Sequence, residues 1–570
     1  MSENRTRLII VLAGVALIAL CIIGKLFYLQ IVNGEAFARK ADRQYSPSST
    51  GIFDRGVIYA TRKDGTLATL ASVSAGFKLA IVPGQIVDKE VAYASINAIV
   101  PIEYETFMAR AAKVNDPYEE IAVRIPKNKA DAIKALKLKG VTLYQDTWRS
   151  YPGGSLASKV IGFVGFKGDT LTGRYGLERQ YNDVLLRLNT NMYTNFFAEV
   201  FHNLKDTFSN TTKEGDLVTT IEPMVQAHLE KQLADVLGKY SADQAGGIIM
   251  DSRTGAVVAM AGIPDYDPNE YGKAGNTSNY GNPLVENVYE LGSIVKAFTI
   301  AAAIDAKVIT PETTYNDKGF IELNGAKLRN YDNKGRGITD MQVVLTESLN
   351  TGAVFAMQKL GRENFRNYFY AFGLNSKTGI DLPGEVNSQV ANLKSTRDVE
   401  YGTASFGQGI ALTPVVAVRA FSALANNGVP VSPFVVSSIQ YPEGTTKKIT
   451  SPAPLAPAIS PETSLAISRM LTTAFEDSPA GRRSQAKTGP WNIAAKTGTA
   501  QIAKEAGGGY YSDRVLHSVI GYFPATNSRF VVLMYMIDPK GEPFSSNTIA
   551  HTYADTARFL LNYYQIPPDR

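Results

Sequence analysis

The amino-acid sequence predicts an α+β protein with a single N-terminal transmembrane helix, an irregular α+β pedestal and a larger C-terminal domain. The first observation is a run at residues 8–24 that is uncharged and almost wholly apolar. The second is a middle region that mixes alternating, strand-like stretches with amphipathic ones, and the third is a C-terminal region of apolar strand-like runs before a helical one. We expect four segments: a tail at 1–7, an anchor at 8–32, a pedestal at 33–215 and a C-terminal domain at 216–570.

Length and composition agree with at least two folded cores. The chain has 570 residues, of which 45% are hydrophobic and 19% are charged, so it is not a disordered chain. The net charge of +5 is small for this length, and we expect no nucleic-acid partner. The single cysteine, Cys21, excludes an internal disulfide. The four histidines have no ligand spacing, so we expect neither a metal nor another cofactor.

The anchor at 8–32 has one alternative, which is a cleavable signal peptide. The apolar region of a signal peptide is normally shorter and ends in a small-x-small site, which this sequence lacks. A lipoprotein signal is disfavoured because Leu20, just before Cys21, is too large for that cleavage. Arg5 and Arg7 precede the span, so the positive-inside rule places the N-terminus in the cytoplasm. We therefore expect a single-pass protein of the inner (plasma) membrane, with its folded domains outside the cytoplasm.

The pedestal contains both kinds of secondary structure. Residues 76–82 predict a strand and residues 128–136 predict a short amphipathic helix. A polar, turn-rich run at 210–216 marks the boundary with the C-terminal domain. Beyond this run, Pro223 opens a helix whose apolar residues recur at helical spacing, and we expect Gly238 to end it.

The C-terminal domain contains a predicted hairpin and two central strands. Residues 246–260 have the pattern of a β-hairpin. The apolar runs at 519–523 and 530–536 predict paired central strands, and residues 549–564 predict a closing helix. These segments supply core and no further nucleophile candidate.

Three short strings in the second half carry the chemistry: Ser293-Ile294-Val295-Lys296, Ser348-Leu349-Asn350 and Lys496-Thr497-Gly498. Each alone is common in a chain of this length, but their occurrence together, in this order and with wide gaps, is specific. In the first string a hydroxyl and an amine lie three residues apart, on one face of a helix. A serine is a poor nucleophile until a neighbour takes its proton, and a lysine can do so once burial lowers its pKa.

The second and third strings supply what acyl transfer still needs. Ser348 can relay a proton, and the side-chain amide of Asn350 can both donate to and accept from a peptide-like substrate. Lys496 follows a strand-like run that we expect to line a cleft at the edge of a sheet. Lys496 and the hydroxyls of Thr497 and Thr499 would then bind a substrate carboxylate.

Backbone N–H groups of the same strings could stabilise the negative charge that develops on the substrate carbonyl oxygen. Gly498 permits a close approach of the backbone, and the N–H groups of Ser293 and Thr499 are candidates for an oxyanion hole. The string Lys-Thr-Gly also occurs earlier, at 487–489. That copy is followed by Pro490, which lacks the N–H that such a site needs, so we interpret it as a surface loop.

The three strings resemble those of the penicillin-binding proteins and serine β-lactamases in form and order. Further segments resemble class B penicillin-binding proteins, namely 246–260, 264–269 and 405–414 in the C-terminal domain, and 55–58, 64–68 and 176–178 in the pedestal. The likeness covers nearly the whole chain. It implies a transpeptidase domain with an antiparallel sheet flanked by helices, preceded by a dimerisation-like pedestal.

The resemblance also implies a function, a peptidoglycan D,D-transpeptidase that cross-links stem peptides and is acylated by β-lactams. Its implied roles are Ser293 as nucleophile, Lys296 as base, Ser348 and Lys496 as proton relay, and Asn350, Thr497, Gly498 and Thr499 as substrate-binding residues. It implies a multi-span glycosyltransferase partner in the membrane. The stretch 406–409 and the tyrosines at 510–511 favour the cell-division type over the elongation type.

Three positions depart from the usual family pattern. Proline is usual where Leu291 stands, threonine is usual at Ile294, and glycine is usual at Ala495. None of these changes removes a reactive group. They bear on the fine geometry of the site and on its sensitivity to individual β-lactams.

Two other functional classes remain open at this point. A D,D-carboxypeptidase or β-lactamase would use the same residues but transfer the acyl group to water, and the long pedestal and single anchor argue against it. A non-enzymatic receptor that β-lactams merely acylate would need a signalling segment. Only a handful of residues precede the predicted span.

Overall fold

The computed structural model describes residues 54–569, except 169, 188–213, 274–276, 450–454, 479–488 and 505–507, together with five positions between 17 and 28. Most of the anchor predicted at 8–32 lies outside these residues. Within the described part of the chain, no helix is both long and apolar enough to cross a membrane. The chain forms two compact units: a larger one of residues 57–72, 151–185 and 214–570, and a smaller one built around residues 73–150.

The smaller unit is an α+β body with its own core. The end of strand β2 (Leu67–Ile81) pairs there with β3 (Glu119–Ile125) and β4 (Val141–Ser150). Its helices are α3 (Lys89–Asn97), α4 (Tyr104–Ala111) and α5 (Lys127–Ala135). Side chains such as Leu79, Ile96 and Phe107 form the core. The strand predicted at 76–82 and the helix predicted at 128–136 are therefore confirmed.

The larger unit is organised around a five-stranded antiparallel sheet. Its strands, in spatial order, are β16 (Ala494–Ala503), β17 (Tyr510–Phe523), β18 (Phe530–Ile537), β8 (Gln244–Asp251) and β9 (Val257–Ile263). This order leaves β16 at one edge, as predicted for the strand that carries Lys496. The predicted hairpin is β8–β9, and the predicted central pair is β17–β18.

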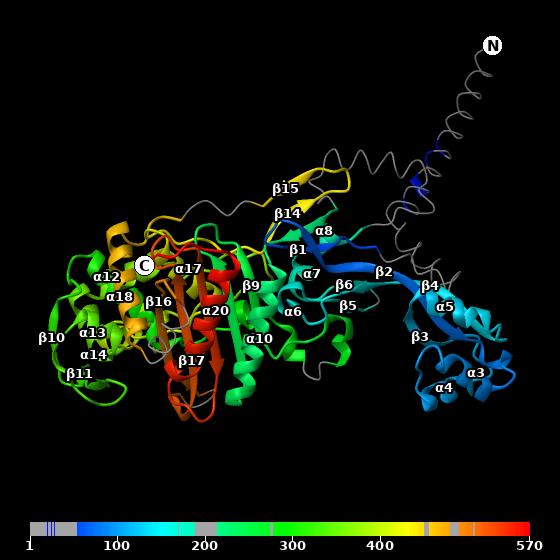
Figure 1. The fold of residues 1–570 in the computed structure, drawn as a ribbon, viewed down its shortest axis with the longest axis horizontal. Coiled ribbons are helices and arrows are strands. Elements are labelled where there is room, and N and C mark those ends of the chain that lie inside the picture. The colour runs from blue at the N-terminus through cyan, green and yellow to red at the C-terminus, as the bar shows by residue number, and fades with distance from the viewer. Residues whose placement is uncertain are drawn as a thin grey trace, which may run out of the picture. The chain divides into compact units, whose positions relative to one another are not determined.

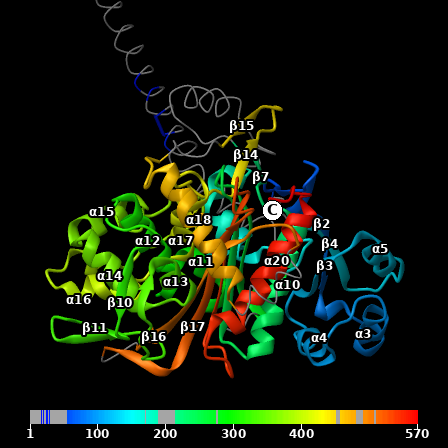
Figure 2. The ribbon, with the colours of Figure 1, turned by 60° about the vertical axis from the view of Figure 1, so that its left-hand side comes forward.

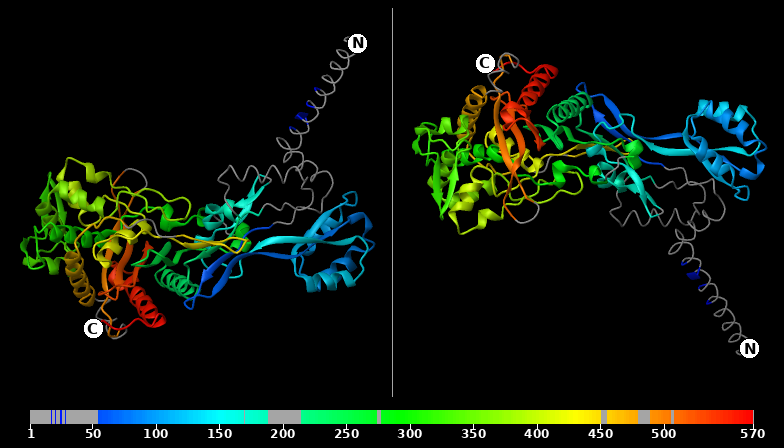
Figure 3. Two further views of the ribbon diagram at one scale, coloured as in Figure 1. Left: turned by 90° about the horizontal axis from the view of Figure 1, so that it is seen from above. Right: turned by 90° about the horizontal axis from the view of Figure 1, so that it is seen from below.

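Helices cover both faces of this sheet. On one face, α10 (Pro223–Tyr240) packs against β8 and β9, and α20 (Ile549–Tyr563) packs against β17 and β18. Both helices lie in front of the sheet in Figure 1, and α20 stays against the orange strands in both views of Figure 3. On the other face, α17 (Pro414–Ala425) contacts β8, β17 and β18.

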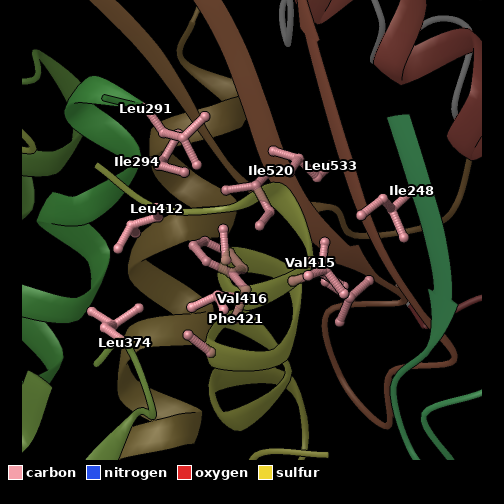
Figure 4. Close-up of a cluster of buried hydrophobic side chains, with 14 of the residues drawn as sticks. Ile248, Leu291, Ile294, Leu374, Leu412, Val415, Val416, Phe421, Ile520 and Leu533 are labelled. Atoms are coloured by element: carbon pink, nitrogen blue, oxygen red, sulfur yellow. The ribbon is translucent and has the colours of Figure 1, made fainter. Parts of the chain in front are cut away.

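Side chains alternate between the two faces, so each strand contributes to two cores. Ile248 belongs to the core beneath α17, whereas its neighbour Ile249 belongs to the core beneath α10 and α20. Figure 4 shows Ile248, Ile520 and Leu533 of the sheet packed against α17. A sheet buried on both faces is a rigid base for the edge strand β16.

A helical lobe lies beside β16 within the larger unit (Figure 2). Its helices are α12 (Lys296–Asp305), α13 (Met341–Thr346), α14 (Asn350–Leu360), α15 (Arg362–Ala371), α16 (Asp398–Ala404) and α18 (Pro461–Glu476). Two small antiparallel pairs complete the lobe, β10 (Thr314–Asp317) with β13 (Gly337–Asp340), and β11 (Phe320–Leu323) with β12 (Ala326–Arg329).

The larger unit also includes strands and helices from the range predicted as pedestal. Its strands from that range are β1 (Ile58–Thr61) and the start of β2. They pair with three strands of the predicted C-terminal domain, in the order β15 (Thr446–Lys448), β14 (Val436–Gln440), β7 (Asp216–Thr219), β1 and β2. Residues 151–185 add α6 (Ser158–Ile161), α7 (Gly176–Gln180), α8 (Asn182–Leu185) and the pair β5 (Val164–Lys167) and β6 (Thr170–Gly173).

One predicted helix end is wrong. Helix α10 continues through Gly238 to Tyr240, and Ser241 ends it in the left-handed conformation with φ 47°. Gly238 has open space around its Cα, so nothing in the packing requires a stop there. The apolar residue Val236, two positions before the glycine, is buried against the sheet and keeps the last turn helical.

Candidate active site

The nucleophile candidate lies at the start of a buried helix. Ser293 is in the 3-10 turn η5 (Gly292–Val295), which leads directly into α12. The residues of α12 from Lys296 to Ala303 are all buried, because this helix is apolar on every side. The side chains of Ser293 and Lys296 share one face, and Lys296 Nζ lies 3.0 Å from Ser293 Oγ.

Ser348 joins the site from the turn between α13 and α14. It has φ +57°, an uncommon conformation for a residue other than glycine. In this conformation Lys296 Nζ lies 2.5 Å from the Ser348 carbonyl oxygen and 3.1 Å from Ser348 Oγ. The same hydroxyl lies 3.1 Å from Lys496 Nζ, so Ser348 bridges the two lysines.

Lys496 reaches this bridge from the edge strand β16. Nine-tenths or more of its surface is buried, and its Nζ also donates to the carbonyl of Thr497 at 3.0 Å. Thr497 and Thr499 lie two residues apart, so both hydroxyls are on one face of the strand. Ser293, Lys296, Ser348 and Lys496 are thus brought together by direct contacts, from three separate segments.

Burial governs the charge of the two lysines. It lowers the pKa of Lys296 well below 10.5, and the nearby charge of Lys496 lowers it further. Burial also lowers the pKa of Lys496 to about 7. Within the described part of the chain, neither lysine makes an ion pair with a carboxylate that would oppose this effect. A neutral Lys296 can therefore accept a proton from Ser293.

This coupling predicts a pH effect of Lys496→Gln. Removing the positive neighbour raises the pKa of Lys296, because one of the two causes that lower it is lost. The acid limb of the acylation rate should therefore move to higher pH, together with a loss of rate of about a hundredfold at neutral pH. The measurement is the acylation rate of the full-length protein by a β-lactam across pH, with Lys487→Gln as the control. An acid limb that stays in place, or moves to lower pH, contradicts the coupling.

Close backbone contacts hold η5, the turn that carries Ser293 and is called the nucleophile turn below, against β16. A Cβ on Gly292, which has φ +66°, would lie 2.8 Å from the carbonyl oxygen of Thr499. A Cβ on Gly498 would lie 2.3 Å from the carbonyl oxygen of Leu291, and Ser518 Oγ donates to that same oxygen at 2.8 Å. The predicted oxyanion-hole residues, Ser293 and Thr499, therefore belong to two backbone segments in direct contact.

A third glycine, Gly407, also lies in close contact with the backbone of the nucleophile turn. Gly407 has φ +87°, and a Cβ there would lie 2.0 Å from the carbonyl oxygen of Gly292. We expect Gly407→Ala to displace Ser293 and to lower β-lactam acylation about a hundredfold, since misplacing a reacting group by about 1 Å has effects of this size. Gly444→Ala is the matched control, because Gly444 has φ +86° and a Cβ there would meet no atom within 4 Å. The control should lose only about 1 kcal/mol of stability, and equal acylation by both variants would contradict the contact's role.

Asn350 and Thr499, two of the predicted substrate-binding residues, have hydrogen-bond partners of their own. The side-chain amide of Asn350 donates to the carbonyl of Arg329 at 2.8 Å, which leaves its oxygen and second N–H for a ligand. The hydroxyl of Thr499 lies 3.3 Å from Ser545 Oγ and accepts from the Ser545 N–H at 3.2 Å. Ser545 was not singled out from the sequence, because nothing local distinguishes it.

Glu290 is a second residue that the sequence reasoning missed. Its carboxylate accepts from the hydroxyl of Tyr510 at 3.0 Å and from the N–H of Gly409 at 3.0 Å. Burial raises its pKa above the ordinary value. The signal was available, since Glu290 is a charged residue three positions before the nucleophile. It ties the 406–409 stretch and the start of β17 to the nucleophile turn.

Two further predictions concern features away from this cluster. The first Lys-Thr-Gly copy lies mostly outside the described residues, and only Gly489 of it is described. Among the described residues, no group of histidine, cysteine, aspartate and glutamate side chains could hold a metal ion.

Fold and contacts together define a class of protein: one with a lysine-paired serine at the edge of a helix-covered antiparallel sheet. Two family models match the chain, the penicillin-binding protein transpeptidase domain over residues 245–555 and the penicillin-binding protein dimerisation domain over residues 53–187. The chain belongs to the penicillin-binding protein family that combines these two domains, the class B arrangement.

Curated relatives and solved structures agree with this assignment. The chain is 32% identical to stage V sporulation protein D of Bacillus subtilis, over 96% of this chain and 84% of that protein. It is 27% identical to the peptidoglycan D,D-transpeptidase FtsI of Buchnera aphidicola, over 96% of this chain and 93% of that protein.

The solved structures show the shared fold. Penicillin-binding protein 2X of Streptococcus thermophilus has a TM-score of 0.70 and 20% identity, covering 90% of this chain and 80% of that one. Penicillin-binding protein 3 of Mycobacterium tuberculosis, complexed with aztreonam, has a TM-score of 0.69 and 21% identity, covering 91% of this chain and 98% of that one. The predicted α+β transpeptidase fold is confirmed.

Proposed function

We propose that this protein is a peptidoglycan D,D-transpeptidase that cross-links stem peptides through an acyl-enzyme on Ser293 and is acylated there by β-lactams. The observation that carries the proposal is the 3.0 Å contact between Ser293 Oγ and Lys296 Nζ. A buried lysine with a strongly lowered pKa, beside a serine at the start of a helix, is an activated nucleophile and its base. Relatives that bear the name peptidoglycan D,D-transpeptidase support the choice of substrate.

Acylation would start with proton transfer from Ser293 Oγ to Lys296 Nζ. The oxygen then attacks the carbonyl carbon of the penultimate D-alanine, and the N–H groups of Ser293 and Thr499 stabilise the negative oxygen that forms. The peptide C–N bond breaks as its nitrogen takes a proton through Ser348 and Lys496, which lie within 3.1 Å of each other. The terminal D-alanine leaves, with its carboxylate having been held by Thr497 and Thr499.

In the transfer step, the amine of a second stem peptide would take the place of the departed D-alanine, and the proton transfers would run in the opposite direction. The acceptor amine of a second stem peptide gives up a proton, attacks the acyl-enzyme carbonyl and forms the cross-link, and Ser293 Oγ recovers its proton. A β-lactam would follow the first half only. Its leaving nitrogen stays tethered to the acyl group after ring opening, and we identify no separate base for deacylation among the described residues of the cluster.

The setting of the enzyme is also proposed from the sequence. A single anchor at 8–32, with Arg5 and Arg7 on its cytoplasmic side, would place the catalytic domain outside the inner (plasma) membrane. A multi-span glycosyltransferase in the same membrane would supply glycan strands to be cross-linked. We favour the cell-division type, on the resemblance at 406–409 and 510–511.

The test is whether the acyl group passes to an amine or to water. We expect the full-length protein in detergent to convert a stem-peptide thioester and a D-amino acid acceptor to the exchanged product. A D,D-carboxypeptidase or β-lactamase would give only hydrolysed product at every acceptor concentration. Absence of any reaction, with a β-lactam adduct still formed on Ser293, would favour the non-enzymatic receptor.

A further inference from the structure

Two exposed aromatic rings from separate segments of the larger unit contact each other. Tyr331 is 53% exposed and Phe544 is 41% exposed. Their ring centroids lie 5.6 Å apart at an interplanar angle of 77°, an edge-to-face contact. The two residues are more than 200 positions apart in the chain, so the pairing is a product of the fold.

Tyr331 is held close to Asn350, the last residue of the string Ser348-Leu349-Asn350. The preceding residue, Asn330, is buried, and its side-chain oxygen accepts from the N–H of Thr351 at 3.2 Å. Its amide nitrogen donates to the buried carboxylate of Asp317 at 2.9 Å. One position earlier, Arg329 accepts from Asn350. The backbone on the N-terminal side of Tyr331 is therefore anchored beside Asn350.

Phe544 is held close to Thr499 of strand β16. Its neighbour Ser545 begins the short turn η7 (Ser545–Asn547) and donates its N–H to Thr499 Oγ1 at 3.2 Å. The segment that carries Asn350 and the strand that carries Thr499 meet at the contact between Ser348 and Lys496. One ring therefore belongs to the segment beside Asn350 and the other to the segment beside Thr499, so their contact joins the two segments that carry the predicted substrate-binding residues.

We propose that Tyr331 and Phe544 form an aromatic gate that limits the size of the substrate's C-terminal residue. The inference rests on the proposed function, in which Thr497 and Thr499 hold the terminal carboxylate. The side chain next to that carboxylate then lies under the two rings. A methyl group fits beneath a closed pair, whereas a branched side chain forces the rings apart and loses their contact.

The test compares two pentapeptide donors that differ only in the leaving residue, one ending in D-Ala-D-Ala and the other in D-Ala-D-Leu. Both give the same acyl-enzyme, so a difference in acylation rate reports recognition of the leaving residue alone. We expect the full-length protein to acylate about tenfold or more faster with the D-alanine donor. Tyr331→Ala and Phe544→Ala should each reduce this ratio to about threefold or less, chiefly by faster reaction with the D-leucine donor.

Two control variants separate the gate from general effects. Tyr331→Phe keeps the ring and should keep the wild-type ratio. Phe166→Ala removes another exposed aromatic side chain, on β5, and should also leave the ratio unchanged. Intact-mass measurement of the Ser293 adduct with a β-lactam shows that each variant is folded and reactive.

The possible failures are distinguishable. If the wild-type protein is acylated but shows no preference, or if both alanine variants keep the wild-type ratio within about twofold, the gate is overturned and the proposed function stands. If the wild-type protein is acylated by neither peptide donor, the proposed function fails and the gate falls with it.

Discussion

Replacing Ser293 with alanine is expected to abolish acyl-enzyme formation by β-lactams and by D-alanyl-D-alanine donors. The variant lacks the nucleophilic hydroxyl that lies 3.0 Å from Lys296 Nζ, and we assign the other hydroxyl near this amine, Ser348 Oγ, to the proton relay, so the loss should be on the order of ten-thousandfold or more. The fold should persist, because Ser293 is only partly buried and the substitution removes a single atom. Intact-mass spectrometry after penicillin treatment measures the adduct, and peptide mapping locates it.

A second serine provides the control for this experiment. Ser468 of α18 is buried and bonded to the hydroxyl of Tyr522 at 2.6 Å, and it makes no contact with the catalytic cluster. Ser468→Ala should be labelled like the wild type. Labelling of the folded Ser293→Ala protein at the wild-type rate, or an adduct mapped to another residue, would refute the assignment of the nucleophile.

Replacing Lys296 with methionine is expected to have opposite effects on activity and stability. Acylation should fall about a thousandfold or more, because Ser293 loses its base. The melting temperature should rise by a few degrees at neutral pH, since methionine fills the buried site without the unfavourable burial of an amine. Loss of the bond to the Ser348 carbonyl offsets part of this gain.

The stability effect has a defined pH dependence. The pKa of Lys296 is lower in the folded protein than the value of 10.5 expected when it is unfolded. Above pH 10.5 both states are neutral and the pKa difference carries no penalty. As the pH falls below 10.5, the unfolded state binds the proton first, so the wild-type protein loses stability until the folded pKa is reached. The advantage of methionine should therefore grow from alkaline to neutral pH, as calorimetry at several pH values would show.

Another buried lysine serves as the control for Lys296→Met. Lys159 is 5% exposed, and burial lowers its pKa to about 8. It lies over the ring of Tyr266 and makes no contact with the catalytic residues. Lys159→Met should leave acylation within about twofold of the wild type. Equal loss of acylation in the two variants would remove the catalytic interpretation of Lys296.

The sequence predicted the features that depend on local spacing. The shared face of Ser293 and Lys296 follows from a three-residue interval. An edge strand was expected from the strand-like run just before Lys496, and the observed strand β16 begins at Ala494 and continues through Lys496. The positive φ of Ser348 was not predictable, since no local rule favours it for serine in this turn. Its conformation is stabilised by Lys296, which is 52 residues away in the chain.

Residues that support the site were harder to find than those that react. Ser545 and Tyr331 act through tertiary contacts that have no counterpart in local sequence pattern. Glu290 was detectable in principle, because it is a charged residue three positions before the nucleophile, but its partners Gly409 and Tyr510 are distant in the chain and could not be predicted. Gly238 misled the prediction for a related reason: a helix-stop signal is local, whereas the packing of α10 on the sheet is not.

The glycines around the nucleophile turn bear on how this enzyme could evolve resistance to β-lactams. Gly292, Gly407 and Gly498 each face backbone atoms at distances that leave no room for a methyl group. We expect few escape substitutions at these positions, because a side chain there would also displace the serine needed for cell-wall synthesis. Adaptive substitutions should accumulate instead at side chains with freedom to change, such as those that rim the cleft. An inhibitor whose affinity depends on the backbone near these glycines would therefore meet fewer viable escape mutations than one that depends on the rim.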